Sequence, residues 1–110
     1  MVLSILFNLF ISFVLTTNVY ITGRLSSEKG TVSGKEIILK TGGKTIANAI
    51  TKQDGSYEMT FLDTYAQSEP LKFYLVGKSK RDLVLLKTVA TLESDTPVID
   101  LVIPTKVSKY

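Results

Sequence analysis

The sequence predicts an all-β fold, a seven-stranded antiparallel sandwich of two sheets. After residue 17, short runs in which apolar and polar residues alternate are separated by turns rich in Gly, Asp and Ser. No run of helical periodicity interrupts them. The 110 residues have the size of one domain, and a single sheet would leave a large apolar face in water. Two sheets packed face to face are therefore expected.

The first three predicted strands follow from alternation and from one tight turn. The run 19–25 (VYITGRL) alternates as a strand does, and the polar loop SSEKGTVSG follows it. The runs 35–40 and 44–51 flank Gly42 and Gly43, which tolerate the positive φ angles of a hairpin turn. These two runs are therefore predicted to pair with each other.

The fourth predicted strand follows the turn QDGS, in which Asp54 and Gly55 are a strong hairpin signal. Tyr57, Met59 and Phe61 then alternate with polar residues, which indicates one apolar face and one face in water. We interpret Gly55 and Tyr57 as structural residues. Gly55 adopts positive φ at little cost, and Tyr57 points into the core, where its hydroxyl can reach a backbone acceptor.

The last three predicted strands are 71–76, 83–92 and 98–103. The first and third alternate, and Pro104 ends the third. The run 83–92 is nearly continuously apolar, which leaves open which of its side chains point inward. The residues expected to form the core are Val19, Ile21, Ile37, Leu39, Tyr57, Met59, Phe61, Leu71, Phe73, Leu75, Ile99, Leu101 and Ile103.

The N-terminal segment 1–17 is apolar and carries no charged side chain. Its apolar stretch is short for a helix that crosses a membrane, and it fits the core of a secretory signal peptide. We therefore expect a cleaved signal peptide at 1–17, a sandwich at 18–104 and a short tail at 105–110. The alternative is an uncleaved membrane anchor, because the uncharged run extends to Gly23.

The composition argues against an enzyme. The chain has no His and no Cys, which removes the commonest general base, thiol nucleophiles, disulfides and the usual zinc sites. Glu93 and Asp95 share one turn, but two carboxylates are too few for a hard cation that takes six or more oxygens. We expect no catalytic residue, no cofactor and no metal ion.

Lys78, Lys80 and Arg81 form the clearest charge cluster, in a chain whose net charge is only +3. Lys72 and Lys87 are candidates to lie near it on the flanking strands. The cluster predicts contact with an acidic protein, an anionic glycan or lipid head groups. The alternative is a solvated turn whose charges discourage edge pairing. Nucleic acid is not expected as a partner. Proteins that bind it usually combine a broad basic stripe with stacking aromatic side chains, and a secreted domain rarely meets it.

Four sequence stretches together resemble the transthyretin-like, or prealbumin-like, sandwich superfamily. They are VYITGRL, KEIILKTGGKTIANAITKQDGSYEM, PLKFYLVG and PVIDLVIP. The order of an apolar strand, a Gly turn, a small-residue strand and Asp54-Gly55-x-Tyr57 is typical of carboxypeptidase regulatory-like domains and of small secreted nematode transthyretin-like proteins. The resemblance implies a two-sheet sandwich over about 18–104.

The chain also departs from this superfamily. The branch that hydrolyses hydroxyisourate relies on histidines, and secreted nematode members commonly carry cysteines; this chain has neither. Transthyretin binds hormone in a channel formed by a tetramer, and the sequence leaves the oligomeric state open. The resemblance therefore implies a fold without implying either activity.

The sequence favours two functions. The first is a secreted, non-enzymatic module that binds an extracellular or cell-surface protein, glycan or lipid through its loops. The second is a structural accessory domain of the carboxypeptidase regulatory-like kind, contacting a membrane if the N-terminal segment is retained.

Export of the chain should remove the N-terminal segment. Because 1–17 lacks charge and the strand pattern begins at Val19, secreted protein should have a new N-terminus between Thr16 and Val19. Mass spectrometry of secreted material measures this directly. Recovery of the intact N-terminus in a membrane fraction would support the anchor instead.

Overall fold

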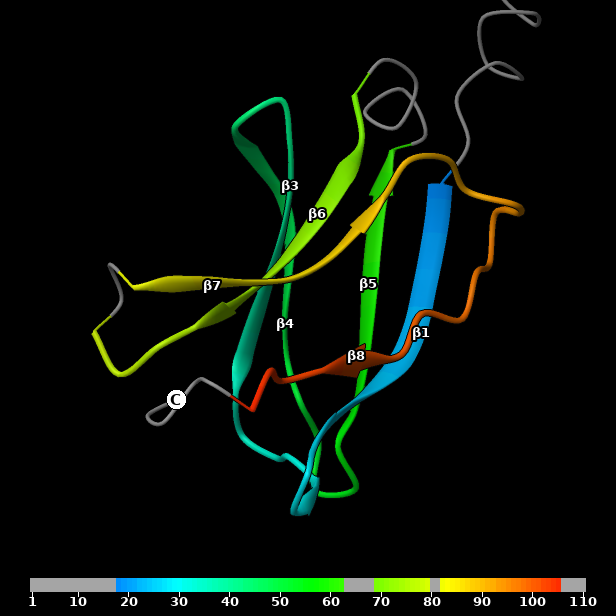
Figure 1. Cartoon of the computed structure of the whole chain (residues 1–110). Helices are drawn as coiled ribbons and strands as arrows, with labels where there is room; N and C mark the ends of the chain where they lie inside the picture. The colour runs from blue at the N-terminus through cyan, green and yellow to red at the C-terminus, as the bar shows by residue number, and fades with distance from the viewer. Residues whose placement is uncertain (1–17, 63–68, 80–81, 106–110) are drawn as a thin grey trace, which may run out of the picture.

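The computed structural model describes residues 18–62, 69–79 and 82–105, which form a β-sandwich of two layers (Figure 1). One sheet has the order β2-β1-β5, with β8 also paired to β1; the other has the order β4-β3-β6-β7. The predicted sandwich is thus confirmed. The strands are β1 (Asn18–Ser27), β2 (Gly30–Thr31), β3 (Glu36–Thr41), β4 (Lys44–Ile50), β5 (Ser56–Leu62), β6 (Leu71–Val76), β7 (Leu83–Val89) and β8 (Leu101–Val102).

The N-terminal segment 1–17 lies outside the described residues, so its predicted role as a signal peptide stays a prediction. Within the described ranges, no helix is long and apolar enough to cross a membrane.

The core lies between the two sheets and contains every side chain that alternation placed there. All thirteen predicted residues are buried. Leu25 of β1 and Val32, just after β2, complete the cluster. Because successive side chains of a strand point to opposite faces, period-2 alternation was sufficient to identify this set.

The structure answers which side chains of the run 83–92 point inward. Val84 and Leu86 pack against the core, whereas Leu83 and Leu85 are exposed on the outer face. The strand ends at Val89, so the last part of the predicted strand has left the sheet. This outer face therefore carries large apolar side chains.

The last strand, β8, pairs in parallel, whereas the other strand pairs of the two sheets are antiparallel. β8 spans two residues and runs parallel to β1, with Leu25 opposite Leu101. An isolated parallel bridge joins Thr22 to Val98. After β7 the chain crosses from one sheet to the other. There it runs alongside β1 in the same direction as β1, so the two pair in parallel. The polar loop after β1 also contains the short strand β2, which pairs antiparallel with the end of β1.

Two glycine-containing turns link the central strands. Gly42 and Gly43 have φ angles of 56° and 79° and close the hairpin between β3 and β4. Gly55 has a φ of 83°, and its N–H donates to the carbonyl of Lys52 at 2.9 Å. However, β4 and β5 belong to different sheets. The Asp54-Gly55 turn therefore connects the two layers instead of closing a hairpin within one sheet.

Asp54 fixes the shape of that turn with its side chain. Its Oδ1 accepts hydrogen bonds from the backbone N–H of Ser56 at 3.0 Å and from the Ser56 hydroxyl at 2.6 Å. These bonds hold the pKa of Asp54 below its ordinary value, with the nearby Arg24 guanidinium adding to the effect. The carboxylate is therefore the form that the turn favours.

Tyr57 links β5 to the segment that precedes β8. Its ring passes over Gly23, its neighbour in β1. Its hydroxyl donates a 2.6 Å hydrogen bond to the carbonyl of Ile99. Gly23 is in register with Tyr57, and a Cβ on Gly23 would lie 1.9 Å from that carbonyl oxygen. Burial, together with Asp100, raises the pKa of Tyr57, so the hydroxyl remains a donor.

A substitution at Gly23 tests how much this close approach to Ile99 contributes to the free energy of unfolding, beyond the contribution of the strand itself. Gly23→Ala should lower the free energy of unfolding by about 1–3 kcal/mol, because Ile99 must move. Thr22→Ala, whose side chain lies on the opposite face, is the matched control and should cost less. Chemical denaturation measures both, and equal midpoints for the two variants would contradict the close approach.

Candidate functional site

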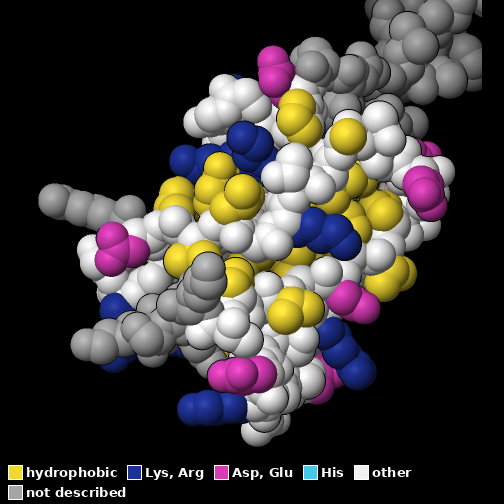
Figure 2. Space-filling view, in the orientation of Figure 1, with side chains coloured by type: hydrophobic (Ala, Val, Ile, Leu, Met, Phe, Trp, Pro, Cys, Tyr) yellow, Lys and Arg dark blue, Asp and Glu magenta, His cyan; other side chains and the backbone are white. Residues whose placement is uncertain are grey.

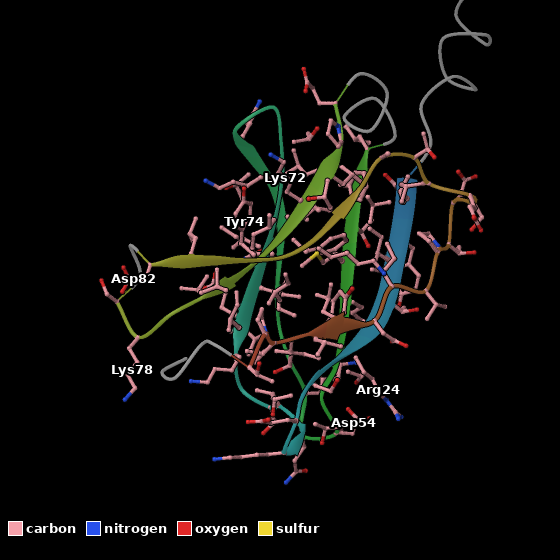
Figure 3. All side chains as sticks on the ribbon, viewed as in Figure 1. Arg24, Asp54, Lys72, Tyr74, Lys78 and Asp82 are labelled. Carbon is pink, nitrogen blue, oxygen red and sulfur yellow. The ribbon has the colours of Figure 1, made fainter. Side chains whose placement is uncertain are left out.

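The predicted basic turn joins β6 to β7, and the structure describes it in part. The N–H of Gly77 donates to the carbonyl of Asp82, and the N–H of Asp82 donates to that of Ser79, each at 2.8 Å. Lys78 is exposed, and in Figure 3 it extends away from the sandwich. The other two members of the predicted cluster, Lys80 and Arg81, lie outside the described residues.

Lys72 and Lys87 lie away from this turn, which corrects the expectation that they flank it. Lys72 is at the opposite end of β6 from Lys78, as Figure 3 shows, and it lies in register with Lys40 of β3. Lys87 is in the second half of β7, in register with Phe73. The described part of the basic turn thus presents Lys78 without these two lysines.

A pocket of about 340 Å³ opens at the edge of the sandwich, between β7 and the connecting segment 91–99. Half of its lining is apolar and half is polar. The apolar side chains are Val89, Leu92, Pro97, Val98 and Ile99, and the polar ones are Lys87, Thr91, Glu93, Ser94 and Thr96. We call this the edge pocket. Its size falls at the lower end of the range for small-molecule sites.

Backbone hydrogen bonds fix one wall of the edge pocket against β1. The N–H of Tyr20 donates to Asp95 at 2.8 Å, and the N–H of Thr22 donates to Pro97 at 3.2 Å. In return the N–H of Ile99 donates to the carbonyl of Thr22 at 2.8 Å. Although this segment is largely irregular, it is held like an edge strand. The wall is therefore formed before any ligand arrives.

Lys87 enters the pocket because a bulge changes the side to which it points. β7 shifts register between Phe73 and Tyr74 of β6, so that Phe73 pairs with Lys87 but Tyr74 pairs with Leu85. Leu86 is the extra residue. Since Phe73 is fully buried, Lys87 projects from the inner side of an edge strand.

The charges and apolar surface of the edge pocket define what it can hold. Figure 2 shows hydrophobic side chains gathered in the opening beside β7, with a basic side chain among them. Within the described residues, no salt bridge pairs Lys87 or Glu93. An apolar floor with a free ammonium group suits a ligand that has an apolar body and one anionic group. Glu93 also lines the pocket, and its carboxylate would repel a second anionic group.

The described residues offer no group of three His, Cys, Asp or Glu side chains that could hold a metal ion. Glu93 lies beside the edge pocket, and the backbone carbonyl of Asp95 is bonded to β1.

Sequence reasoning missed the edge pocket. The available signal was Lys87, which is the single charge in the otherwise apolar and hydroxyl-bearing run 83–92. Period-2 alternation places it on the same face as Leu85, which is the outer face. The bulge at Leu86 reverses this placement, and no feature of the run marks a bulge.

Comparisons with known proteins support the fold. No protein-family model and no curated protein sequence match the chain. Among solved structures, the crystal structure of a 9R-lipoxygenase from Cyanothece PCC8801 is similar, with a TM-score of 0.56 and 15% sequence identity. The similarity covers 79% of this chain but only 16% of the lipoxygenase chain. At this identity it supports the β-sandwich architecture alone.

The basic turn has its own test. Replacing Lys78, Lys80 and Arg81 by Ser should leave the unfolding midpoint nearly unchanged, because exposed charges contribute little to stability. If the turn contacts an acidic surface, binding to a heparin-like glycan or to anionic liposomes should fall in the variant, and should fall with salt in the parent protein. Equal binding by the two proteins, or no binding by either, would mean that the turn is merely solvated.

Proposed function

We propose that this chain is a secreted, non-enzymatic binding module of the transthyretin-like sandwich type, which binds an amphipathic anionic partner through its loops. The observation that carries the proposal is the edge pocket, whose loop wall is fixed to β1 and whose ammonium group projects from the inner face of β7. The transthyretin-like assignment is supported by the four sequence stretches and by the two-sheet sandwich.

The chemistry of the pocket favours binding over catalysis. Val89, Leu92 and Ile99 supply apolar surface, and Lys87 supplies one cation. The Lys87 side chain is exposed, so its ammonium attracts a carboxylate, sulfate or phosphate with the modest strength of a surface ion pair, and the neighbouring apolar surface adds to the binding. Within the described residues, the hydroxyl groups that line the pocket form no hydrogen bond to the Glu93 carboxylate or the Lys87 ammonium.

The proposal is tested with a probe that has both chemical features. Anilinonaphthalene sulfonate carries an aromatic body and one sulfonate, and its fluorescence rises in apolar surroundings. We expect the protein to bind it, and Lys87→Met to weaken binding by about threefold to tenfold, as expected for a contact of about 1 kcal/mol. Methionine keeps the length and apolar stem of the side chain while removing its charge.

Lys29→Met is the matched control, since Lys29 is an exposed lysine in the turn between β1 and β2, outside both the edge pocket and the basic turn. Its affinity for the probe should equal that of the parent protein. Decanoate should compete with the probe, because it combines an alkyl chain with a carboxylate. Equal affinities of the two lysine variants, or failure of decanoate to compete, would contradict binding in the edge pocket.

A second function is an accessory domain beside a larger protein, like the carboxypeptidase regulatory-like domains. What favours it is that a similar sandwich makes up 16% of a lipoxygenase chain, so this fold occurs as part of a large protein. Affinity capture from the native extracellular fluid or membrane fraction separates the two functions. A stoichiometric large partner supports the accessory domain, whereas release as a free protein supports the binding module.

A further inference from the structure

The outer face of the sheet β4-β3-β6-β7 carries a row of apolar side chains on three neighbouring strands. Ile38, Tyr74 and Leu85 are in register with one another, one each on β3, β6 and β7. Leu85 is 46% exposed, and Val76 and Leu83 form a second in-register pair that lies beside the row. We call this the outer row. A contiguous patch of this kind on a sheet face marks an interaction surface more often than isolated exposed residues do.

The charges beside the outer row are arranged symmetrically on β3. The outward positions of that strand are Glu36, Ile38 and Lys40, so an acid and a base flank the central isoleucine at equal spacing. The Lys40 Nζ lies 5.9 Å from the centre of the Tyr74 ring, which keeps its charge close to the outer row. If a second copy of β3 lay over the first in the opposite direction, each of these charges would therefore face a charge of opposite sign.

The same surface has a local electrostatic defect. Lys40 and Lys72 are directly opposite each other on β3 and β6, and like charges in that position are destabilising. Glu69 lines a depression of about 170 Å³ beside them, but within the described residues it forms no salt bridge with either lysine. A further carboxylate placed over Lys40 would relieve it.

We propose that two copies of this chain pack face to face through the outer row, with the two-fold axis lying along it. Under this operation Ile38 faces its own counterpart. Lys40 faces Glu36 of the second copy, and this contact occurs twice. Such an interface is self-complementary, as an isologous dimer requires. Packed sheets lie about 10 Å apart, a gap that apolar side chains from both faces fill.

The charges also select this axis over the other one. A two-fold axis parallel to the strands would keep each charged row facing a row of the same sign, and would place Lys40 near Lys72 of the second copy. The axis along the outer row avoids that repulsion. The proposed dimer uses the outer face, so it does not depend on the edge pocket, and either proposal can fail without the other.

A charge exchange tests the interface. In sedimentation velocity of the purified full-length protein, the parent chain should dimerise. Lys40→Glu and Glu36→Lys should each raise the dimer dissociation constant about tenfold or more, because like charges then face each other. The double variant Lys40→Glu/Glu36→Lys should restore dimerisation. Lys29→Glu, at an exposed lysine in the turn between β1 and β2, makes the same change of net charge as Lys40→Glu and should have no effect.

Cross-linking provides a second measurement that does not depend on the charge variants being stable. The chain contains no cysteine, so Leu85→Cys introduces a unique thiol on the proposed axis. A short bismaleimide should then link two chains efficiently, whereas Val102→Cys, on β8 of the other sheet, should give little product. A monomer at submillimolar concentration, a double variant no better than the single ones, or equal cross-linking at the two positions would overturn the proposal.

Discussion

The hydrogen bond from the Tyr57 hydroxyl to the Ile99 carbonyl holds together three parts of the chain that are distant in sequence. Tyr57 belongs to β5, Gly23 lies in β1, and Ile99 lies in the segment that follows the long crossing from the other sheet. The chain contains no cysteine, so no disulfide can fix that crossing. A buried hydroxyl on a backbone carbonyl, at a point where glycine permits close approach, performs this task instead.

The edge pocket depends on the same interaction. Its outer wall is the segment 91–99, which is largely irregular and is therefore stabilised by what it is bonded to. Three backbone hydrogen bonds to β1 hold the wall from Asp95 to Ile99. The Tyr57 hydroxyl donates a further hydrogen bond to the carbonyl of Ile99. A loosening at Gly23 would therefore reach the pocket through the backbone. Stability of the fold and shape of the site are coupled at this position.

The sequence was informative where structure is local and less informative where it depends on long-range pairing. Alternation identified the thirteen core residues because each strand has one face toward the other sheet. The Gly42-Gly43 turn was readable for a similar reason, since positive φ is a local requirement. A tight turn at Asp54-Gly55 was predictable, but not that its flanking strands belong to different sheets. The sheet that each strand joins depends on partners distant in sequence.

The parallel direction of β8 and the position of Lys87 were not predictable for the same physical reason. β8 alternates like any other strand, and its direction follows from the route of the chain between the sheets. Lys87 and Leu85 are two residues apart, so a regular strand would present both on one face. The inserted Leu86 separates them, and it is visible only as a mismatch with β6.

That insertion connects the outer row with the edge pocket. Before Leu86, β7 contributes Leu85 to the outer row; after it, the strand contributes Lys87 to the edge pocket. A regular strand would put the lysine charge on the outer face beside Leu85, and would leave the pocket without a cation. Bulges are common on edge strands, where they also discourage pairing with other chains, and an inward lysine has the same effect. The constraint that protects this edge therefore also leaves Leu83 and Leu85 on the outer face of β7 and places the one lysine of the strand at the edge pocket.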